Sequence, residues 1–271
     1  MEHHVSWLTH FVNHYLSSLA SAFLNALHIR PQNPDLPIPE HVVMMIVVVL
    51  IGSLLVLWLR SRLSVERPGA AQQVAEMLLT NPMGFGIRDL VEENAGHGAQ
   101  EFIAMVGTVG LFVLLANLLS VFPFFTAPTS VVSVPLGCAI ITFLYFNWQG
   151  ARHHGAFGYL KHFGGPIWWL SPLMFPVEIL STTARVLSLT VRLWANIFAS
   201  DLLYSIFLSL LVGPSLWGFH KFAPLGVVLG IFPATIPILF IGLHIFVSII
   251  QAYVFTLLPS IYIGLAVAEE H

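Results

Sequence analysis

The chain has 271 residues, of which 57% are hydrophobic and only 8% are charged. Because soluble domains carry about 25% charged residues, this sequence has too little polar surface for a soluble enzyme of its size. The formal net charge of −3 includes no long run of Lys or Arg, which excludes nucleic acid as the partner.

The sequence also lacks the usual local signatures of catalytic and cofactor sites. It contains no GxxxxGK(S/T), GxSxG or HExxH string, and its one cysteine, Cys138, cannot form an intrachain disulfide. We therefore expect no catalytic residue, no cofactor, no resident metal and no direct nucleotide binding. His10 and His14, four residues apart, could hold a metal, although exposed histidines without a role fit the pattern better.

Residues 1–40 are predicted to form an amphipathic helix and a loop on the external side of a membrane. Within residues 1–30 the apolar residues recur at three- and four-residue steps, as in a helix that lies in the membrane interface. A signal peptide is excluded because the positively charged n-region and a continuous apolar stretch are both missing. Four prolines between residues 31 and 39 predict the loop.

Residues 41–271 are predicted to form a membrane domain. A helix needs about 20 apolar residues to cross a bilayer, and charge-free runs predict crossings at about 42–60, 102–123 and 131–150. Basic residues follow the first and third of these runs, which places the N-terminus outside the cell: Arg60, Arg62, Arg67, Arg152 and Lys161. A short cytoplasmic helix is predicted at 70–79.

Two long helices are predicted at about 167–219 and 222–268, on either side of the polar joint His220–Lys221. The second run has 47 residues without a charge, and as one helix it would be about 70 Å long. It must therefore tilt, bend or double back within a core of about 30 Å. The predicted fold is an all-α polytopic membrane protein with about five membrane helices.

Arg192 lies in the middle of an apolar segment, where an arginine costs about 2.5–3.5 kcal/mol to insert. Arg185 and Asn196 share its helical face, which is otherwise lined by small residues: Ser188, Ala195 and Ala199. Asp201 lies on the opposite face, and Glu178 is fourteen residues away. The spacing therefore implies a carboxylate from another subunit. The alternative is a pair with Asp201 or Glu178 within the chain.

A second polar set, His244, Ser248 and Gln251, follows spacings of four and three and shares one helical face. A histidine can accept and release a proton near neutral pH, and a polar stripe in a membrane helix usually faces a water-filled path. The alternative is that His244 and Gln251 only form hydrogen bonds between helices.

These segments resemble subunit a of the F-type ATP synthase. The resemblance lies in Ser188–Asp201, in His244–Gln251 with the apolar segment after it, and in Asn117–Pro123, and it covers most of residues 40–271. It implies five crossings, of which the last two helices lie strongly tilted, near the membrane plane. It also implies a non-catalytic, proton-conducting stator in a bacterial inner membrane, with its C-terminus in the cytoplasm.

The resemblance also implies partners and roles for particular residues. The partners are the rotating ring of c subunits, the peripheral-stalk b subunits and the lipid bilayer. Arg192 would meet the ring's essential carboxylate, and four residues would line two aqueous half-channels: Asn196, Asp201, His244 and Gln251. Arg185, Glu178 and Ser248 are secondary candidates. The chain has Ser120, Val131 and Val132 where some bacterial relatives carry acids, so its outer half-channel has a different lining.

Two other functions deserve comparison. A secondary transporter binds its solute at broken membrane helices, and the 17 prolines of the chain allow such breaks. A membrane enzyme or haem carrier needs a nucleophile with a base, or paired histidines, inside the spans, whereas His244 is the only histidine well inside a charge-free run. The sequence leaves open whether the transported ion is H⁺ or Na⁺.

Overall fold

A computed structural model describes residues 6–26, 28, 33, 36–81, 84–96, 99–122, 125–162, 169–221 and 223–267, with no side-chain description at 156, 157, 160–162, 204, 208, 210–221 and 223–237. The described residues form helices and no strand. The helices are α1 (Trp7–Ala26), α2 (Glu40–Ser61), α3 (Ala70–Leu79), α4 (Ile87–Ala95), α5 (Gln100–Leu119), the 3₁₀ helix η1 (Pro128–Ser130), α6 (Ser133–His162), α7 (Ser171–Lys221) and α8 (Ala223–Val267).

Four stretches among the described helices are long and apolar enough to cross a membrane. They are α2, α5, the Ser171–Phe207 part of α7 and the Ile238–Val267 part of α8. The predicted all-α polytopic membrane fold is thus confirmed. Helix α6 covers the predicted crossing at 131–150 but does not belong to this set, because Asn147 and Gln149 dilute its apolar side chains. Its crossing stays a prediction.

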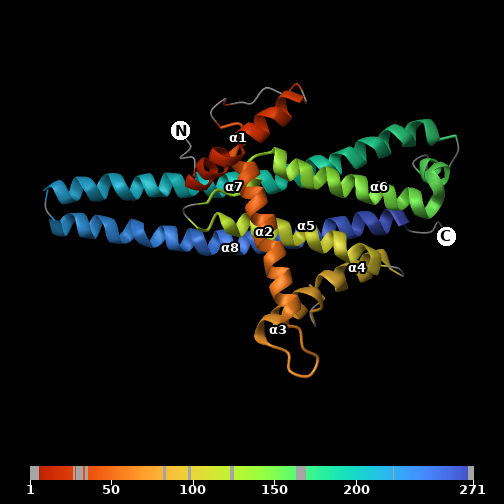
Figure 1. Cartoon of the computed structure of the whole chain (residues 1–271), viewed down its shortest axis with the longest axis horizontal. Coiled ribbons are helices and arrows are strands. Elements are labelled where there is room, and N and C mark those ends of the chain that lie inside the picture. The colour runs from red at the N-terminus through yellow and green to blue at the C-terminus, as the bar shows by residue number, and fades with distance from the viewer. Residues whose placement is uncertain are drawn as a thin grey trace.

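Helices α7 and α8 are much longer than a bilayer is thick. They have 51 and 45 residues, or about 77 Å and 68 Å at about 1.5 Å per residue. Figure 1 shows them side by side along the longest axis of the molecule, with α2 crossing them. Because α8 is one continuous helix, the structure excludes one of the three alternatives for this run, the one in which it doubles back. Tilting and bending are the remaining ways to fit it into a core of about 30 Å.

The inner face of α7 is held in a close-packed apolar core. Its fully buried residues Leu189, Leu193 and Ile197 pack in one cluster with Phe255 of α8 and Val113 of α5. Packing at this density resists displacement of a single element. The core therefore fixes the rotation of α7 about its own axis, and with it the direction in which the opposite face points.

Helix α1 is the predicted amphipathic helix, and its existence is confirmed. The Asn13 amide nitrogen donates to the carbonyl of Ile38, and the Ile38 backbone N–H donates back to Asn13 Oδ1, both at 3.0 Å. These bonds attach α1 to the segment that leads into α2. Its large apolar side chains are exposed: Trp7, Phe11, Tyr15, Leu19 and Phe23. Such a face is typical of a helix in a membrane interface.

Candidate functional site

Arg192 lies on the face of α7 that points away from the apolar core, and it is exposed. Among the described residues, its guanidinium makes one polar contact, a hydrogen bond at 3.4 Å from Nη2 to Ser188 Oγ, one turn earlier on the same helix. No ion pair joins it to an acidic side chain within the described part of the chain. Ala195 and Ala199 are exposed on the same side, so another helix could approach this face closely.

The two acids considered as partners of Arg192 have other neighbours. Glu178 forms an ion pair with Arg185 at 3.8 Å, and the Arg185 guanidinium lies 5.1 Å from the centre of the Tyr262 ring. Asp201 lines a cavity between α7 and α8. The arrangement among the described residues therefore favours the interpretation in which the partner of Arg192 comes from outside the chain.

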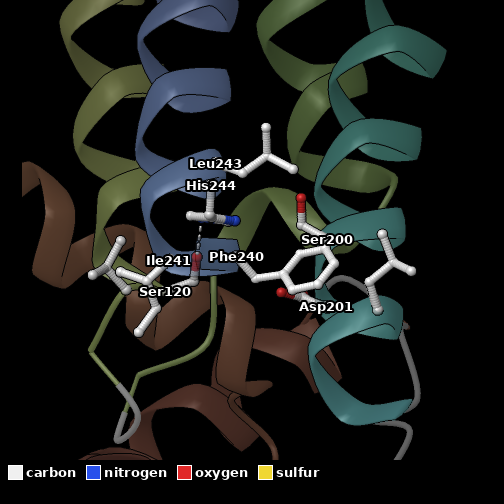
Figure 2. Close-up of a pocket in the computed structure, with 9 residues that line it drawn as sticks. Ser120, Ser200, Asp201, Phe240, Ile241, Leu243 and His244 are labelled. Atoms are coloured by element: carbon white, nitrogen blue, oxygen red, sulfur yellow. Dashed lines mark hydrogen bonds between the residues drawn. The ribbon is translucent and has the colours of Figure 1, made fainter. Parts of the chain in front are cut away.

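A cavity of about 180 Å³ lies between α7, α8 and the C-terminal end of α5, and we call it the α7–α8 cavity. It is lined by Ser120, Val121, Ser200, Asp201, Leu203, Phe240, Ile241, Leu243 and His244. His244 on α8 and Asp201 on α7 both line this space, together with the Phe240 ring (Figure 2). The structure thus brings together two predicted site residues that are 43 positions apart.

The imidazole of His244 is bonded to the end of α5. Its Nε2 atom lies 2.8 Å from Ser120 Oγ and 3.1 Å from the carbonyl oxygen of Asn117. The side chain of Asn117 accepts a hydrogen bond from Thr129 Oγ1 at 2.7 Å. Sequence reasoning missed Thr129 because nothing in an apolar loop marks one threonine as functional. The sequence analysis named Asn117 only as part of the segment Asn117–Pro123. A polar amide within a charge-free run could have indicated a functional residue on its own.

The other predicted residues do not line this cavity. Gln251 is buried, and its amide nitrogen has no hydrogen-bond partner among the described residues. Ser248 is fully buried and donates to the carbonyl of His244 at 2.7 Å, a bond within α8. Asn196 is half-buried on α7. Of the predicted residues, Asp201 and His244 therefore line the cavity, whereas Ser248 and Gln251 are packed inside the protein.

A second cavity, also of about 180 Å³, lies near the start of α7 and the end of α8. It is lined by Phe146, Tyr159, Glu178, Thr182, Arg185, Tyr262, Leu265 and Ala266. Tyr159 lies on α6 beyond the predicted crossing, and burial raises the pKa of its phenol. The hydroxyl therefore stays protonated at neutral pH and donates to Asn147 Oδ1 at 3.1 Å.

The helical fold, the apolar spans and the ionisable side chains inside them define a polytopic ion-transporting membrane protein. The chain matches the model of the ATP synthase A chain family over residues 41–264 and belongs to that family. It is thus a proton-translocating subunit of the membrane sector of an ATP synthase. This membership decides against the secondary transporter and the haem carrier.

Relatives of this chain share nearly its whole length. It is 41% identical over 268 residues to ATP synthase subunit a of Koribacter versatilis, covering 99% of both chains. It is 39% identical over 259 residues to that of Solibacter usitatus, covering 96% of this chain and 99% of the relative. Together with the apolar helices, these relatives fit a bacterial membrane protein.

Proposed function

We propose that this chain is the non-catalytic stator against which a ring of c subunits turns, and that Arg192 meets the ring's essential carboxylate. The observation that carries the proposal is the exposed arginine in an apolar span, with no acidic partner among the described residues. A guanidinium in such a place needs a carboxylate. The small side chains beside it leave room for the helix that brings one.

The mechanism is electrostatic. A fixed positive charge about 4 Å from a carboxylate is worth roughly 4 kcal/mol at an effective dielectric of 20, enough to lower the pKa of that carboxyl by about 1–3 units. A ring carboxyl that reaches Arg192 therefore releases its proton. It takes up another before it returns to lipid, where the neutral form is far less costly. Because Arg192 keeps its own proton, it also blocks direct leakage.

The two cavities are proposed as the inner ends of two half-channels. Glu178 in the second cavity and Asp201 in the α7–α8 cavity are 23 residues apart on α7, or about 35 Å, and Arg192 lies between them. If α7 is strongly tilted, most of this separation runs parallel to the membrane plane, so the two cavities lie at different points around the ring. A proton can then cross only by travelling with the ring, which is how proton flow becomes rotation.

The proposal includes an orientation and further partners. Residues 1–40 lie on the external side and residues 41–271 form the membrane domain, with the C-terminus in the cytoplasm of a bacterium. The basic residues after α2 support this orientation. The peripheral-stalk b subunits anchor the chain, and nucleotides bind elsewhere in the complex.

Cysteine crosslinking tests the contact with the ring. We expect Asn196→Cys, one turn from Arg192, to form a disulfide with a cysteine placed beside the essential carboxylate of a c subunit. Leu193→Cys is the control, because Leu193 is fully buried in the apolar core shared with α5 and α8. Equal crosslinking at both positions, or none at position 196 in an active complex, would contradict the proposed interface.

Replacing Asp201 by asparagine tests the α7–α8 cavity as a half-channel. We expect a several-fold loss of passive proton conductance in membrane vesicles, because the change removes a titratable carboxyl that faces His244. Ser205→Ala is the control, since Ser205 is an exposed residue on α7 whose hydroxyl donates to the Leu202 carbonyl of the same helix. Unchanged conductance in Asp201→Asn would exclude this carboxyl from the proton path.

A further inference from the structure

The contacts of His244 determine which of its ring nitrogens carries hydrogen. The carbonyl oxygen of Asn117 lies 3.1 Å from Nε2 and can only accept a hydrogen bond. If Nε2 were unprotonated, two lone pairs would face each other at that distance. The Nε2 atom must therefore be the donor.

The position of Ser120 agrees with this assignment. Its Oγ donates to the Asn117 carbonyl at 2.9 Å, so the serine hydrogen is already committed. The serine oxygen, 2.8 Å from Nε2, is then free to accept the hydrogen of the imidazole. One set of proton positions thus satisfies all three contacts, with the Nε2–H group shared between the hydroxyl and the carbonyl.

The acceptor is held in place by the end of α5. The Asn117 carbonyl is among the last four of the helix, which have no partner within it. The side chain of the same residue is bonded to Thr129, and both residues are fully buried. The imidazole therefore binds to a fixed point on a different helix from its own.

We infer that Ser120 is a positioning residue that, together with the Asn117 carbonyl, holds His244 as the Nε2–H form, so that protons enter and leave at Nδ1. This inference rests on the proposed role of His244 in proton translocation. The Nδ1 lone pair takes a proton from water or from the Asp201 carboxyl, and the new N–H bond later breaks to release it. Because Nε2 keeps its hydrogen in both states, the ring can cycle without losing its anchor.

The surroundings of the imidazole suit this exchange. Across the α7–α8 cavity the titratable group that faces it is Asp201 of α7. Helix α5 contributes the neutral Ser120 and Asn117, and among the described contacts Nδ1 has no hydrogen-bond partner. Among the residues that line the cavity, the imidazole and this carboxyl are the titratable groups, and Ser200 adds a neutral hydroxyl beside them.

The test uses the complete ATP synthase in membrane vesicles and three variants: Ser120→Ala, Ser120→Thr and His244→Gln. ATP-driven proton pumping is measured against pH and normalised to the amount of assembled complex. We expect Ser120→Ala to pump about fivefold more slowly with a shifted pH profile, because a half-buried hydrogen bond that holds the imidazole is lost. Ser120→Thr keeps the hydroxyl and should restore most of the rate. His244→Gln keeps a nitrogen donor in place of Nε2 but no titratable Nδ1, and should be slow at every pH.

The possible results separate this inference from the proposed function. A slow His244→Gln variant together with wild-type rate and pH profile in Ser120→Ala overturns the positioning role alone. The same holds if Ser120→Ala only lowers the amount of complex, or if Ser120→Thr is as slow as Ser120→Ala. A wild-type rate in His244→Gln overturns the role of His244 itself.

Discussion

The Arg192→Ala variant is expected to assemble into the ATP synthase and to lose ATP-driven proton pumping. Arg192 is exposed, and its one polar contact with the described residues is the 3.4 Å bond to Ser188, so its truncation removes little packing. It does remove the fixed charge that, in the proposed mechanism, lowers the pKa of the ring carboxyl. Pumping is measured with a pH-sensitive dye in vesicles, and assembly by copurification of the other subunits.

Val191→Ala is the matched control, since Val191 is the neighbouring exposed residue on α7. It should keep both assembly and pumping. Arg192→Lys keeps a positive charge but loses the planar guanidinium and can itself give up a proton, so it should pump poorly and leak. Normal pumping in Arg192→Ala would remove the basis of the proposed mechanism.

The Gly264→Ala variant is expected to reduce the amount of folded subunit in the membrane severely. A Cβ atom at Gly264 on α8 would lie 2.0 Å from the backbone oxygen of Asn94 at the end of α4. A backbone oxygen cannot rotate away, so the two helices must separate. Overpacking of this kind typically costs about 1–3 kcal/mol or more. Immunoblots of membranes and the thermal stability of the purified complex measure the effect.

Gly137→Ala is the control for that substitution. Gly137 lies in α6, and a Cβ atom there meets nothing within 4 Å. Alanine is also the better helix former, by about 1 kcal/mol, so this variant should be at least as stable as the parent. Equal amounts of subunit in the two variants would show that α4 and α8 do not make the close contact at Gly264.

Local periodicity was enough to predict several elements of this fold. The predicted helix at 70–79 matches α3, and the periodic segment within residues 1–30 contains α1. The isolation of Arg192 could also be predicted, because helical spacing fixes which side chains share its face and no acid lies near it. These are short-range properties, and about 100° per residue is sufficient to derive them.

Contacts between distant segments could not be predicted in this way. The bond between Ser120 and His244 joins residues 124 positions apart, and helical periodicity carries no information about it. The predicted crossing at 131–150 also carried no information on how far α6 extends, and the structure continues it to His162 across a kink at Gly155, where φ is 73°. The basic residues after position 150 indicate that this end of the crossing is cytoplasmic. They do not indicate where the helix ends.

The buried side of α7 has a mechanical consequence for the proposed stator. In the proposed mechanism, the turning ring exerts a lateral force on α7, the helix that carries Arg192. If α7 moved with the ring, a ring carboxyl could pass Arg192 without losing its proton. This helix packs against Phe255 of α8 and Val113 of α5 through its buried residues Leu189, Leu193 and Ile197. The force from the ring is therefore distributed over three helices. The stiffness of that joint then limits how much torque the motor can transmit.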